Sequence, residues 1–599
     1  MTDYRPPLAD IAFALEHAGG LSELAALAEF DHATPEVVAD LLAEAGRFFA
    51  DTVAPLNRSG DLQGAVRNAD GTVTTPDGFA EAYRAFVDAG WATVSFEPGF
   101  GGGGFPWLVG IALQEMLAAA NLAFSLCPML TQGSVDLLEA HGSDEQKARY
   151  LPKLITGEWT GTMCLTEPQA GSDVGAVHTR AVPLPDGTYR ITGTKIFITY
   201  GEHDLAEQTV HLVLARTPAA PAGTKGISLF LVPKFLMDDD GALGARNDVA
   251  CVSIEHKLGI KASPTCVLSF GDDGGALGYL VGEENRGIAC MFTMMNQARL
   301  SVGLEGLALA ERSYQQAYAF AVERRQGRAV GAPAGESSAI VDHPDVRRML
   351  LTMRSTCDAM RRLVYRNAAS IDRARRLPDP AERERAAEQV ALLTPLTKAW
   401  CTDMGVELTS LGVQIHGGAG FCEETGTAQH YRDARIAPIY EGTNGIQAID
   451  LVLRKLPLRE GGVVKDHLAA IGATVDELGA AGPELHPMQA ALRAALAATT
   501  EATAWLADHQ DRPDDQLAGA TPYLRLLATT TAAWLEARTA LIASAQLAAG
   551  TGDASFLRAK VANARFFCEQ LLPAVVGLVP AITAGAAPLF AIDANALSL

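Results

Sequence analysis

The spacing of hydrophobic residues changes twice along the chain. Before about residue 160, apolar positions recur every three or four residues, as on one face of a helix; Leu41, Leu42, Ala45 and Phe48 are an example. From about 160 to 282 the period falls to two, which is typical of strands. From 284 onward the helical period returns. This order of helix, strand and helix predicts an α+β fold that is mostly α-helical.

The region of period two predicts a small β-barrel or sandwich. Val210, Leu212 and Leu214 alternate with their neighbours, and another strand pattern follows a Pro-Asp-Gly turn at 185–187. Several such runs are separated by Gly, Pro and Asp, which favour turns. We therefore expect a middle β domain.

The later helical patterns separate into two groups. Long helices are predicted over 288–325, 343–376 and 386–415, which is typical of a helical bundle. After residue 457, alanine-rich helices are separated by breakers at 479–483 and 511–515. Five regions are predicted: an N-terminal helical extension (1–75), an N-terminal helical domain (76–159), a middle β domain (160–282), a helical bundle (283–456) and an additional C-terminal helical domain (457–599).

Composition narrows the class of protein. Hydrophobic residues make up 48% and charged residues 20% of the 599 residues, as in a globular protein. The net charge of −22 argues against a nucleic-acid scaffold, because phosphate binding needs a basic surface. It still allows an anionic ligand that binds at a local basic patch.

The nine cysteines show neither CxxC pairs nor zinc-ligand spacing, so we expect no metal site. Cys164, Cys251, Cys266 and Cys290 lie among apolar residues and are expected to be buried. The N-terminus has no signal-peptide pattern, and no uninterrupted apolar run reaches membrane-spanning length. These features predict a cytoplasmic protein without a membrane span.

The main candidate for chemistry is the segment 435–447, RIAPIYEGTNGIQ. Glu441 follows an apolar run and precedes a predicted helix at 446–456. A carboxyl group in such a setting loses hydration, which raises its pKa toward that of a useful general base. A Glu ahead of a helix is also often a dipole partner or cap. The residues alone leave both interpretations open.

Four short motifs occur in the order found in the flavin-dependent acyl-CoA dehydrogenases, and the chain resembles that family. They are LTEPQAGSD at 165–173, KIFIT at 195–199, QIHGGAGF at 414–421 and YEGT at 440–443. The resemblance implies an FAD cofactor, an acyl-CoA substrate and dehydrogenation to a trans-2-enoyl-CoA. It also implies that electron-transfer flavoprotein accepts the electrons.

Further segments resemble a longer bacterial branch of the family, at 295–306, 326–328 and 441–448. That branch includes 3-methylmercaptopropionyl-CoA dehydrogenases and broad-range fatty acyl-CoA dehydrogenases, and the choice between these substrates stays open. A homodimer is expected, because the added C-terminal domain would occupy the face that shorter relatives use to form tetramers.

The resemblance assigns roles to individual residues. Glu441 is the base, while the glutamate that other branches use would fall at Ala298, which cannot take a proton. Glu305, on the same predicted helix, is interpreted as a solvated residue. The expected cofactor-binding residues are Met163, Leu165, Thr166, Gly171, Ser172, Phe197, Thr199, Arg324, Gln414, Gly418 and Thr443. The expected substrate-binding residues are Ser172, Asn296, Arg299 and Gly442.

Two other functions remain open on the same fold. One is a flavin-binding DNA-alkylation-response protein, against which the mixed charge after residue 460 and the intact Glu441 count. The other is a flavin oxidase or monooxygenase; monooxygenase relatives lack the glutamate. A second interpretation of Phe197 and Ile198 is that they are ordinary strand residues with no role in binding the cofactor.

Overall fold

The computed structural model describes residues 4–238, 240–333 and 335–598. It contains two compact units. The first unit includes Leu41–Phe105 and Met116–Ser301, and the second includes Pro7–Asp40, Pro106–Glu115 and the chain from Val302 onward. The division into five domains is finer than these two units and stays a prediction.

An eight-stranded sheet forms the centre of the first unit. The strand order is β10-β11-β5-β12-β7-β6-β3, and β4 pairs with β5. These pairs are antiparallel except for the parallel pair of β3 and β6. The bounds are β3 (Thr160–Cys164), β4 (Arg180–Pro183), β5 (Tyr189–Thr199), β6 (Thr209–Ala215), β7 (Ser228–Pro233), β10 (Val249–Ile254), β11 (Thr265–Phe270) and β12 (Ala276–Val281). Two short hairpins are β1 (Val66–Arg67) with β2 (Val73–Thr74), and β8 (Phe235–Met237) with β9 (Leu243–Arg246).

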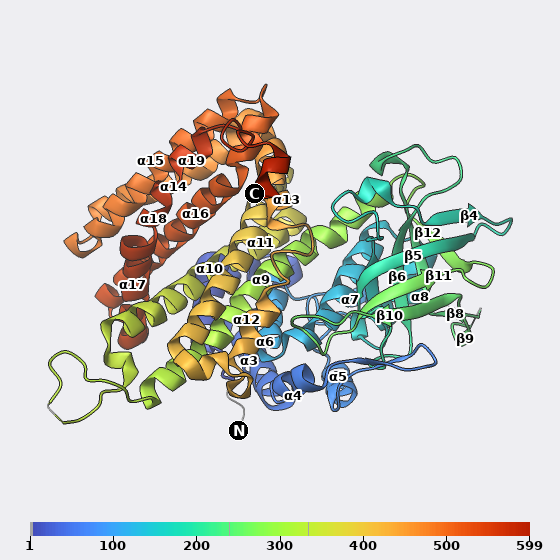
Figure 1. Cartoon of the computed structure of the whole chain (residues 1–599), viewed down its shortest axis with the longest axis horizontal. Coiled ribbons are helices and arrows are strands. Elements are labelled where there is room, and N and C mark those ends of the chain that lie inside the picture. Colours follow the sequence, from blue (N-terminus) through green and yellow to red (C-terminus); the bar gives the residue numbers. More distant parts are fainter. Residues whose placement is uncertain (1–3, 239, 334, 599) are drawn as a thin grey trace. The chain divides into compact units, whose positions relative to one another are not determined.

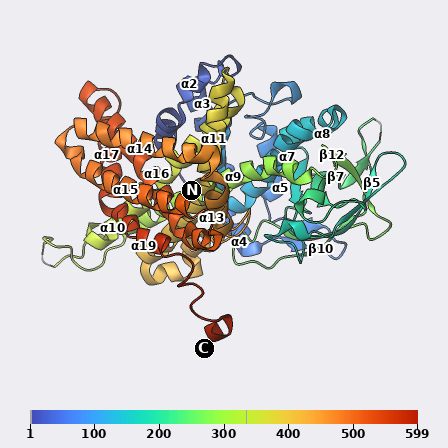
Figure 2. The ribbon, with the colours of Figure 1, turned by 90° about the horizontal axis from the view of Figure 1, so that it is seen from above.

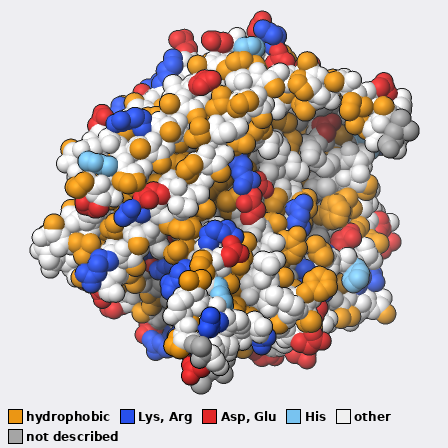
Figure 3. Space-filling view, turned by 60° about the vertical axis from the view of Figure 1, so that its left-hand side comes forward, with side chains coloured by type: hydrophobic (Ala, Val, Ile, Leu, Met, Phe, Trp, Pro, Cys, Tyr) orange, Lys and Arg blue, Asp and Glu red, His pale blue; other side chains and the backbone are white. Residues whose placement is uncertain are grey.

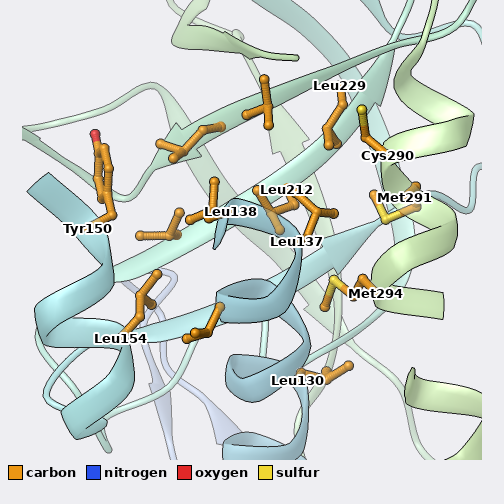
Figure 4. Packing of buried hydrophobic residues seen from close by; sticks show 14 of the residues in the cluster. Leu130, Leu137, Leu138, Tyr150, Leu154, Leu212, Leu229, Cys290, Met291 and Met294 are labelled. Atoms are coloured by element: carbon orange, nitrogen blue, oxygen red, sulfur yellow. The ribbon is translucent and has the colours of Figure 1, made fainter. Parts of the chain in front are cut away.

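Both faces of strand β6 are buried. Leu212 and Leu214 belong to a cluster with residues of α7 (Leu122–His141) and α8 (Asp144–Thr156), and Met291 and Met294 of α9 pack into the same cluster (Figure 4). Val213 and Ala215 point to the other face, where side chains from nearly every strand of the sheet form a second core. The predicted alternation is confirmed, and helices cover the face that would otherwise be exposed.

Three long helices run through the second unit: α9 (Gly287–Glu323), which begins in the first unit, α10 (Pro344–Arg376) and α11 (Pro380–His416). A Cβ atom at Gly306 would lie 2.2 Å from the carbonyl oxygen of Cys401, and one at Gly303 would lie 2.8 Å from that of Thr397. The glycines therefore let α9 approach the backbone of α11. Shorter helices follow at α12 (Thr427–Ala434) and α13 (Asn444–Asp450).

In the second unit, α16 (Pro513–Ala549) and α17 (Ala554–Phe566) pack against α10, and α16 also packs against α11 (Figure 1). After α19 the chain leaves the helices and ends in a short 3₁₀ turn (Figure 2). The other bounds are α14 (Gly462–Ala480), α15 (His486–Asp508), α18 (Pro573–Val576) and α19 (Val579–Thr583). The earlier helices are α1 (Leu8–Ala14), α2 (Leu21–Ala25), α3 (Pro35–Phe48), α4 (Leu56–Gln63), α5 (Phe79–Asp88) and α6 (Trp107–Ala120).

One helical stretch differs from the expectation about membranes. By length and composition, Ala554–Thr583 is apolar enough to cross a bilayer, although it is not an uninterrupted apolar run. Core helices of globular proteins often have the same length and composition. Here α17 carries Lys560, whose ammonium group is buried in ion pairs with Asp10 and Asp358.

Cys164, Cys251, Cys266 and Cys290 are all buried, as predicted, and all are free thiols. Among the residues that the structure describes, no group of three or more His, Cys, Asp or Glu side chains is arranged to hold a metal ion.

Candidate functional site

Glu441 lies in a tight turn ahead of α13. Its φ angle is 54° and that of Gly442 is 81°, so both residues adopt the left-handed conformation. This conformation costs a non-glycine residue about 1–2 kcal/mol. The carbonyl oxygen of Pro438 accepts the N–H of Asn444 at 3.0 Å and closes the turn. Strained residues cluster at functional sites, where the surrounding structure holds them in place.

Asn444 fastens the turn to α11. Its Nδ2 donates to Oδ1 of Asp403 at 2.7 Å and to the carbonyl oxygen of Ala399 at 3.1 Å. Its Oδ1 accepts a hydrogen bond from Nζ of the buried Lys398 at 2.9 Å. One side chain therefore joins the start of α13 to the middle of α11.

Thr443, and not Glu441, caps α13. Oγ1 of Thr443 accepts the N–H of Ile446 at 3.2 Å, so the interpretation of Glu441 as the cap is wrong. Behind the turn, Nε2 of the buried Gln447 donates long hydrogen bonds of 3.4 Å to the carbonyl oxygens of Glu441 and Gly442. These contacts hold the backbone and do not use the carboxyl group of Glu441.

A second carboxyl group lies beside the turn. Glu305 on α9 is 2% exposed, and the hydroxyl of Tyr440 donates a hydrogen bond to its Oε2. Burial raises the pKa of Glu305 to about 8; the charge of Glu441 adds to this, while Tyr440 and Lys398 oppose it. The expectation that Glu305 is solvated is wrong, because its part of α9 is packed among other helices.

Three predicted cofactor residues of the second unit gather at the ends of α9 and α11. The rings of Phe320 and His416 stack with centroids 4.5 Å apart and hold these two helix ends side by side. Thr402 contacts Asn444 in the middle of α11, and the end of α11 at His416 lies about 21 Å farther along the helix, at about 1.5 Å per residue. The group is therefore remote from Glu441 in the same chain. The three exposed residues are Arg324, Gln414 and Gly418.

In the first unit, a buried ion pair joins the motifs at 165–173 and 195–199. Nζ of Lys195 lies 2.7 Å from Oε1 of Glu167 and donates to the carbonyl oxygen of Leu165 at 3.1 Å. Burial alone would raise the pKa of Glu167, but Lys195 lowers it to about 2. The N–H of Ile196 also donates to the carbonyl oxygen of Thr166 at 2.9 Å. These contacts place the first motif beside β5.

Phe197 departs from the geometry of an ordinary strand residue. Its φ is 61° and its side chain is 59% exposed. The pairing of β5 with β11 shifts register at this point, and such bulges re-aim side chains. Thr166 and Thr199 are half-buried. An exposed aromatic ring with hydroxyl groups close by in the chain fold fits a planar ring system that has a polar edge.

The remaining predicted residues of the first unit lie at β3, in the turn that follows it and on α9. Gly171 and Ser172 are exposed in the turn that follows β3, and Asn296 is exposed on α9. Arg299 is buried, and its Nη1 donates to Oδ1 of Asn296 at 3.3 Å. Met163 and Leu165 share the hydrophobic cluster of Met291 and Met294, so β3 lies against the first turns of α9.

The predicted residues thus form three groups: the turn at 441–443, the exposed helix ends, and the β3, β5 and α9 residues of the first unit. Four residues that hold the turn were not predicted: Glu305, Tyr440, Asn444 and Gln447. A signal existed for Glu305, because Gly303 and Gly306 beside it indicate a helix surface that is closely packed. The sequence offers no comparable signal for Asn444.

Four family models match the chain. Residues 36–158, 162–272 and 285–456 match the N-terminal, middle and C-terminal domains of acyl-CoA dehydrogenases. Residues 467–593 match a model described as acetyl-CoA dehydrogenase C-terminal like.

Among curated proteins, the 3-methylmercaptopropionyl-CoA dehydrogenase of Ruegeria pomeroyi is 49% identical over 95% of this chain and 96% of its own length. A broad-specificity linear acyl-CoA dehydrogenase of Mycobacterium tuberculosis is 35% identical over 96% of each chain. Among solved structures, the acyl-CoA dehydrogenase of Bacillus anthracis complexed with FAD has a TM-score of 0.72 at 22% identity, covering 92% of this chain and 87% of that chain.

Proposed function

The chain belongs to the acyl-CoA dehydrogenase family, and we propose that its substrate is 3-methylmercaptopropionyl-CoA. The observation that carries this proposal is the 49% identity to the Ruegeria enzyme of that name, which extends over nearly the whole of both chains. A second candidate substrate is a medium- or long-chain fatty acyl-CoA, which the broad-specificity relative at 35% identity favours. The two candidates share one reaction and differ in the acyl chain.

Glu441 is the base in this proposal. Its carboxylate takes the proton from the α carbon of the thioester, and an N–H of the turn at Gly442 donates to the thioester oxygen, where negative charge develops. FAD, when bound, supplies the acceptor for the hydride that leaves the β carbon. The strained turn and its anchor at Asn444 hold Glu441 in one orientation, which is what proton abstraction from carbon requires.

The residues of the first unit fit the flavin ring. Phe197 offers an exposed aromatic wall, and the hydroxyls of Thr166 and Thr199 suit the polar edge of the ring. Met163 and Leu165 supply apolar contact from β3. Further contacts to the cofactor are assigned to Gly171, Ser172 and Thr443.

Arg324, Gln414 and Gly418 are assigned to the pyrophosphate and adenosine of FAD held by a second copy of the chain. These residues lie far along α11 from the place where the Glu441 turn is attached. This supports the assignment, because an FAD bound beside Glu441 would contact the corresponding residues of the second copy rather than those of its own chain. The proposed assembly is a homodimer. A gel-filtration mass that matches a tetramer would contradict it.

The CoA part of the substrate is assigned to Ser172, Asn296 and Arg299, where Arg299 supplies the positive charge. Electron-transfer flavoprotein is the proposed electron acceptor, and the proposed location is cytoplasmic. Basic and acidic side chains are interspersed on the face shown in Figure 3, which does not favour the DNA-binding alternative.

The test is an anaerobic titration of the purified protein followed by flavin absorbance. We expect 3-methylmercaptopropionyl-CoA to bleach the flavin faster than saturated acyl-CoAs of C4 to C16. Glu441→Gln should slow this reduction by about a thousandfold, because the amide cannot accept the proton. Retained FAD in the variant is the control for folding. Protein that holds no flavin, or a variant that is reduced as fast as the parent, would overturn the reaction; a faster fatty acyl-CoA would overturn only the substrate.

A further inference from the structure

Glu305 is a buried acid with an incomplete set of partners. Oε2 accepts the hydroxyl of Tyr440, while Oε1 has no hydrogen-bond partner among the residues that the structure describes. A buried ionised carboxylate normally has cations or several N–H donors on both oxygens. The arrangement of Glu305 suits a carboxyl group that keeps its proton.

Tyr440 connects this acid to the proposed base. It is the residue directly before Glu441, and its hydroxyl is bound to α9 through Glu305. The strained turn is thus fastened at two places: at Asn444 to α11 and at Tyr440 to α9. Loss of either contact would let a turn that stores backbone strain relax.

We propose that Glu305 is a positioning residue for the dehydrogenation: through Tyr440 it fixes the Glu441 turn, and while neutral it keeps a second negative charge away from the base. This inference rests on the proposed function, because it assigns Glu305 a role only if Glu441 takes a proton. Two like charges close together raise each other's proton affinity, so an ionised Glu305 would raise the pKa of Glu441. Near neutral pH fewer molecules would then hold Glu441 as a carboxylate, whereas above pH 8, where Glu441 is ionised in any case, its carboxylate would be a stronger base.

The groups around Glu305 come from the turn and from α11. Tyr440 and Glu441 come from the turn, and α11 contributes Lys398, whose ammonium group is engaged by Asn444. Asp403, on the other side of Asn444, and Cys401, packed at Gly306, are also on α11, and burial raises the pKa of both. Lys398 is the one cation that acts on Glu305 among these groups, and burial outweighs it.

The first experiment is the pH dependence of the rate of flavin reduction, measured anaerobically from pH 6 to 9.5 in the parent and Glu305→Gln. The amide still accepts the hydroxyl of Tyr440 but cannot ionise. We expect the two rates to agree within about twofold at pH 6 and the parent to show an extra inflection near pH 8, where it becomes about threefold or more faster, since an ionised Glu305 strengthens the base. Superimposable profiles would overturn the electrostatic part of the proposal.

The second experiment tests whether the hydrogen bond between Tyr440 and Glu305 holds the turn. Its stability measurements do not depend on flavin chemistry. Glu305→Leu and Tyr440→Phe each remove one partner of the hydrogen bond, and the double variant removes both. At about pH 4, where Glu305 is largely protonated in both the folded and the unfolded chain, we expect the two single variants to lose free energy of unfolding in urea, and the two losses to be strongly non-additive. We expect Glu305→Gln to restore most of the reduction rate that Glu305→Leu loses at pH 6. Additive losses, or no rescue by the amide, would overturn the positioning role.

The outcomes separate this inference from the proposed function. If the parent reduces its flavin with an acyl-CoA and Glu441→Gln does not, the function stands whatever Glu305 does. If the parent shows no reduction, the function fails, and the non-additive stability losses would still show whether Glu305 and Tyr440 hold the turn together.

Discussion

Two buried carboxyl groups in the second unit, Glu305 and Asp358, have opposite surroundings. Nζ of Lys560 lies 2.9 and 3.0 Å from the two oxygens of Asp358, and Nδ2 of Asn563 donates to it at 3.0 Å. Although burial opposes ionisation, Lys560 and nearby arginines hold the pKa of Asp358 well below its usual range. Glu305 has a tyrosine hydroxyl instead, and burial raises its pKa to about 8.

The difference shows that one unit holds two kinds of buried acid: one that is always ionised and paired with a cation, and one that keeps its proton near neutral pH. Lys560 also pairs with Asp10, so Asp358 is one centre of a network that joins α1, α10 and α17. A carboxylate with a cation partner is a permanent charge and serves to connect helices. A buried carboxyl group whose bound partner is a hydroxyl stays neutral near pH 7, and it can gain or lose charge beside the proposed base.

The largest effect on stability is expected from removing the cation of this network. Lys560→Met leaves Asp358 and Asp10 buried without their ammonium partner, and we expect a loss of about 3–5 kcal/mol in the free energy of unfolding. Lys465→Met, at an exposed position on α14, is the matched control and should change little. Urea unfolding measures both, and a loss below about 1 kcal/mol for Lys560→Met would show that the network is not structural.

A smaller effect of characteristic pH dependence is expected at Glu305. The folded pKa of about 8 exceeds the ordinary value of 4.5, so between these pH values the unfolded chain has released a proton that the folded chain still holds. The stability of the parent should therefore fall as pH rises from about 5 to 8. Glu305→Gln lacks this dependence and should gain roughly 3 kcal/mol relative to the parent across that window, because each pH unit between the two pKa values contributes up to about 1.4 kcal/mol.

The pH dependence of stability that Asp358 contributes has the opposite sign. Its folded pKa lies below the unfolded value, so its contribution is present at neutral pH and is lost only as the solution becomes strongly acidic. Urea unfolding at several pH values measures the Glu305 dependence, and a parent and Glu305→Gln that differ by a constant amount from pH 5 to 8 would show that Glu305 is ionised throughout.

Periodicity located two of the long helices to within about two residues. The helix predicted over 288–325 is α9, Gly287–Glu323, and the one predicted over 343–376 is α10, Pro344–Arg376. These patterns are long, which makes helical periodicity easy to recognise. The same periodicity did not show that both faces of β6 are buried, because that depends on which helices lie over the sheet.

The candidate site was found through motifs, and its supports were not. The segment around Glu441 contains Tyr440 and Asn444, yet their partners Glu305 and Asp403 come from two other helices. A glutamate on a long helix is normally solvated, and burial of Glu305 follows from close packing of helices that a single sequence does not reveal. Local pattern points to the proposed reacting group, while the groups around it come from residues distant in the sequence.

The smallest effect is expected for an exposed carboxylate that also has a cation partner. Oε1 and Oε2 of Glu407 on α11 lie 2.8 and 3.2 Å from the guanidinium of Arg525 on α16, and both side chains are about half exposed. Water and salt screen such a pair, so Arg525→Met should cost less than about 1 kcal/mol, and less still at high salt. Urea unfolding at low and high salt measures this. A loss as large as that of Lys560→Met would mean that pairing with a cation, rather than burial, determines what a carboxylate contributes to stability.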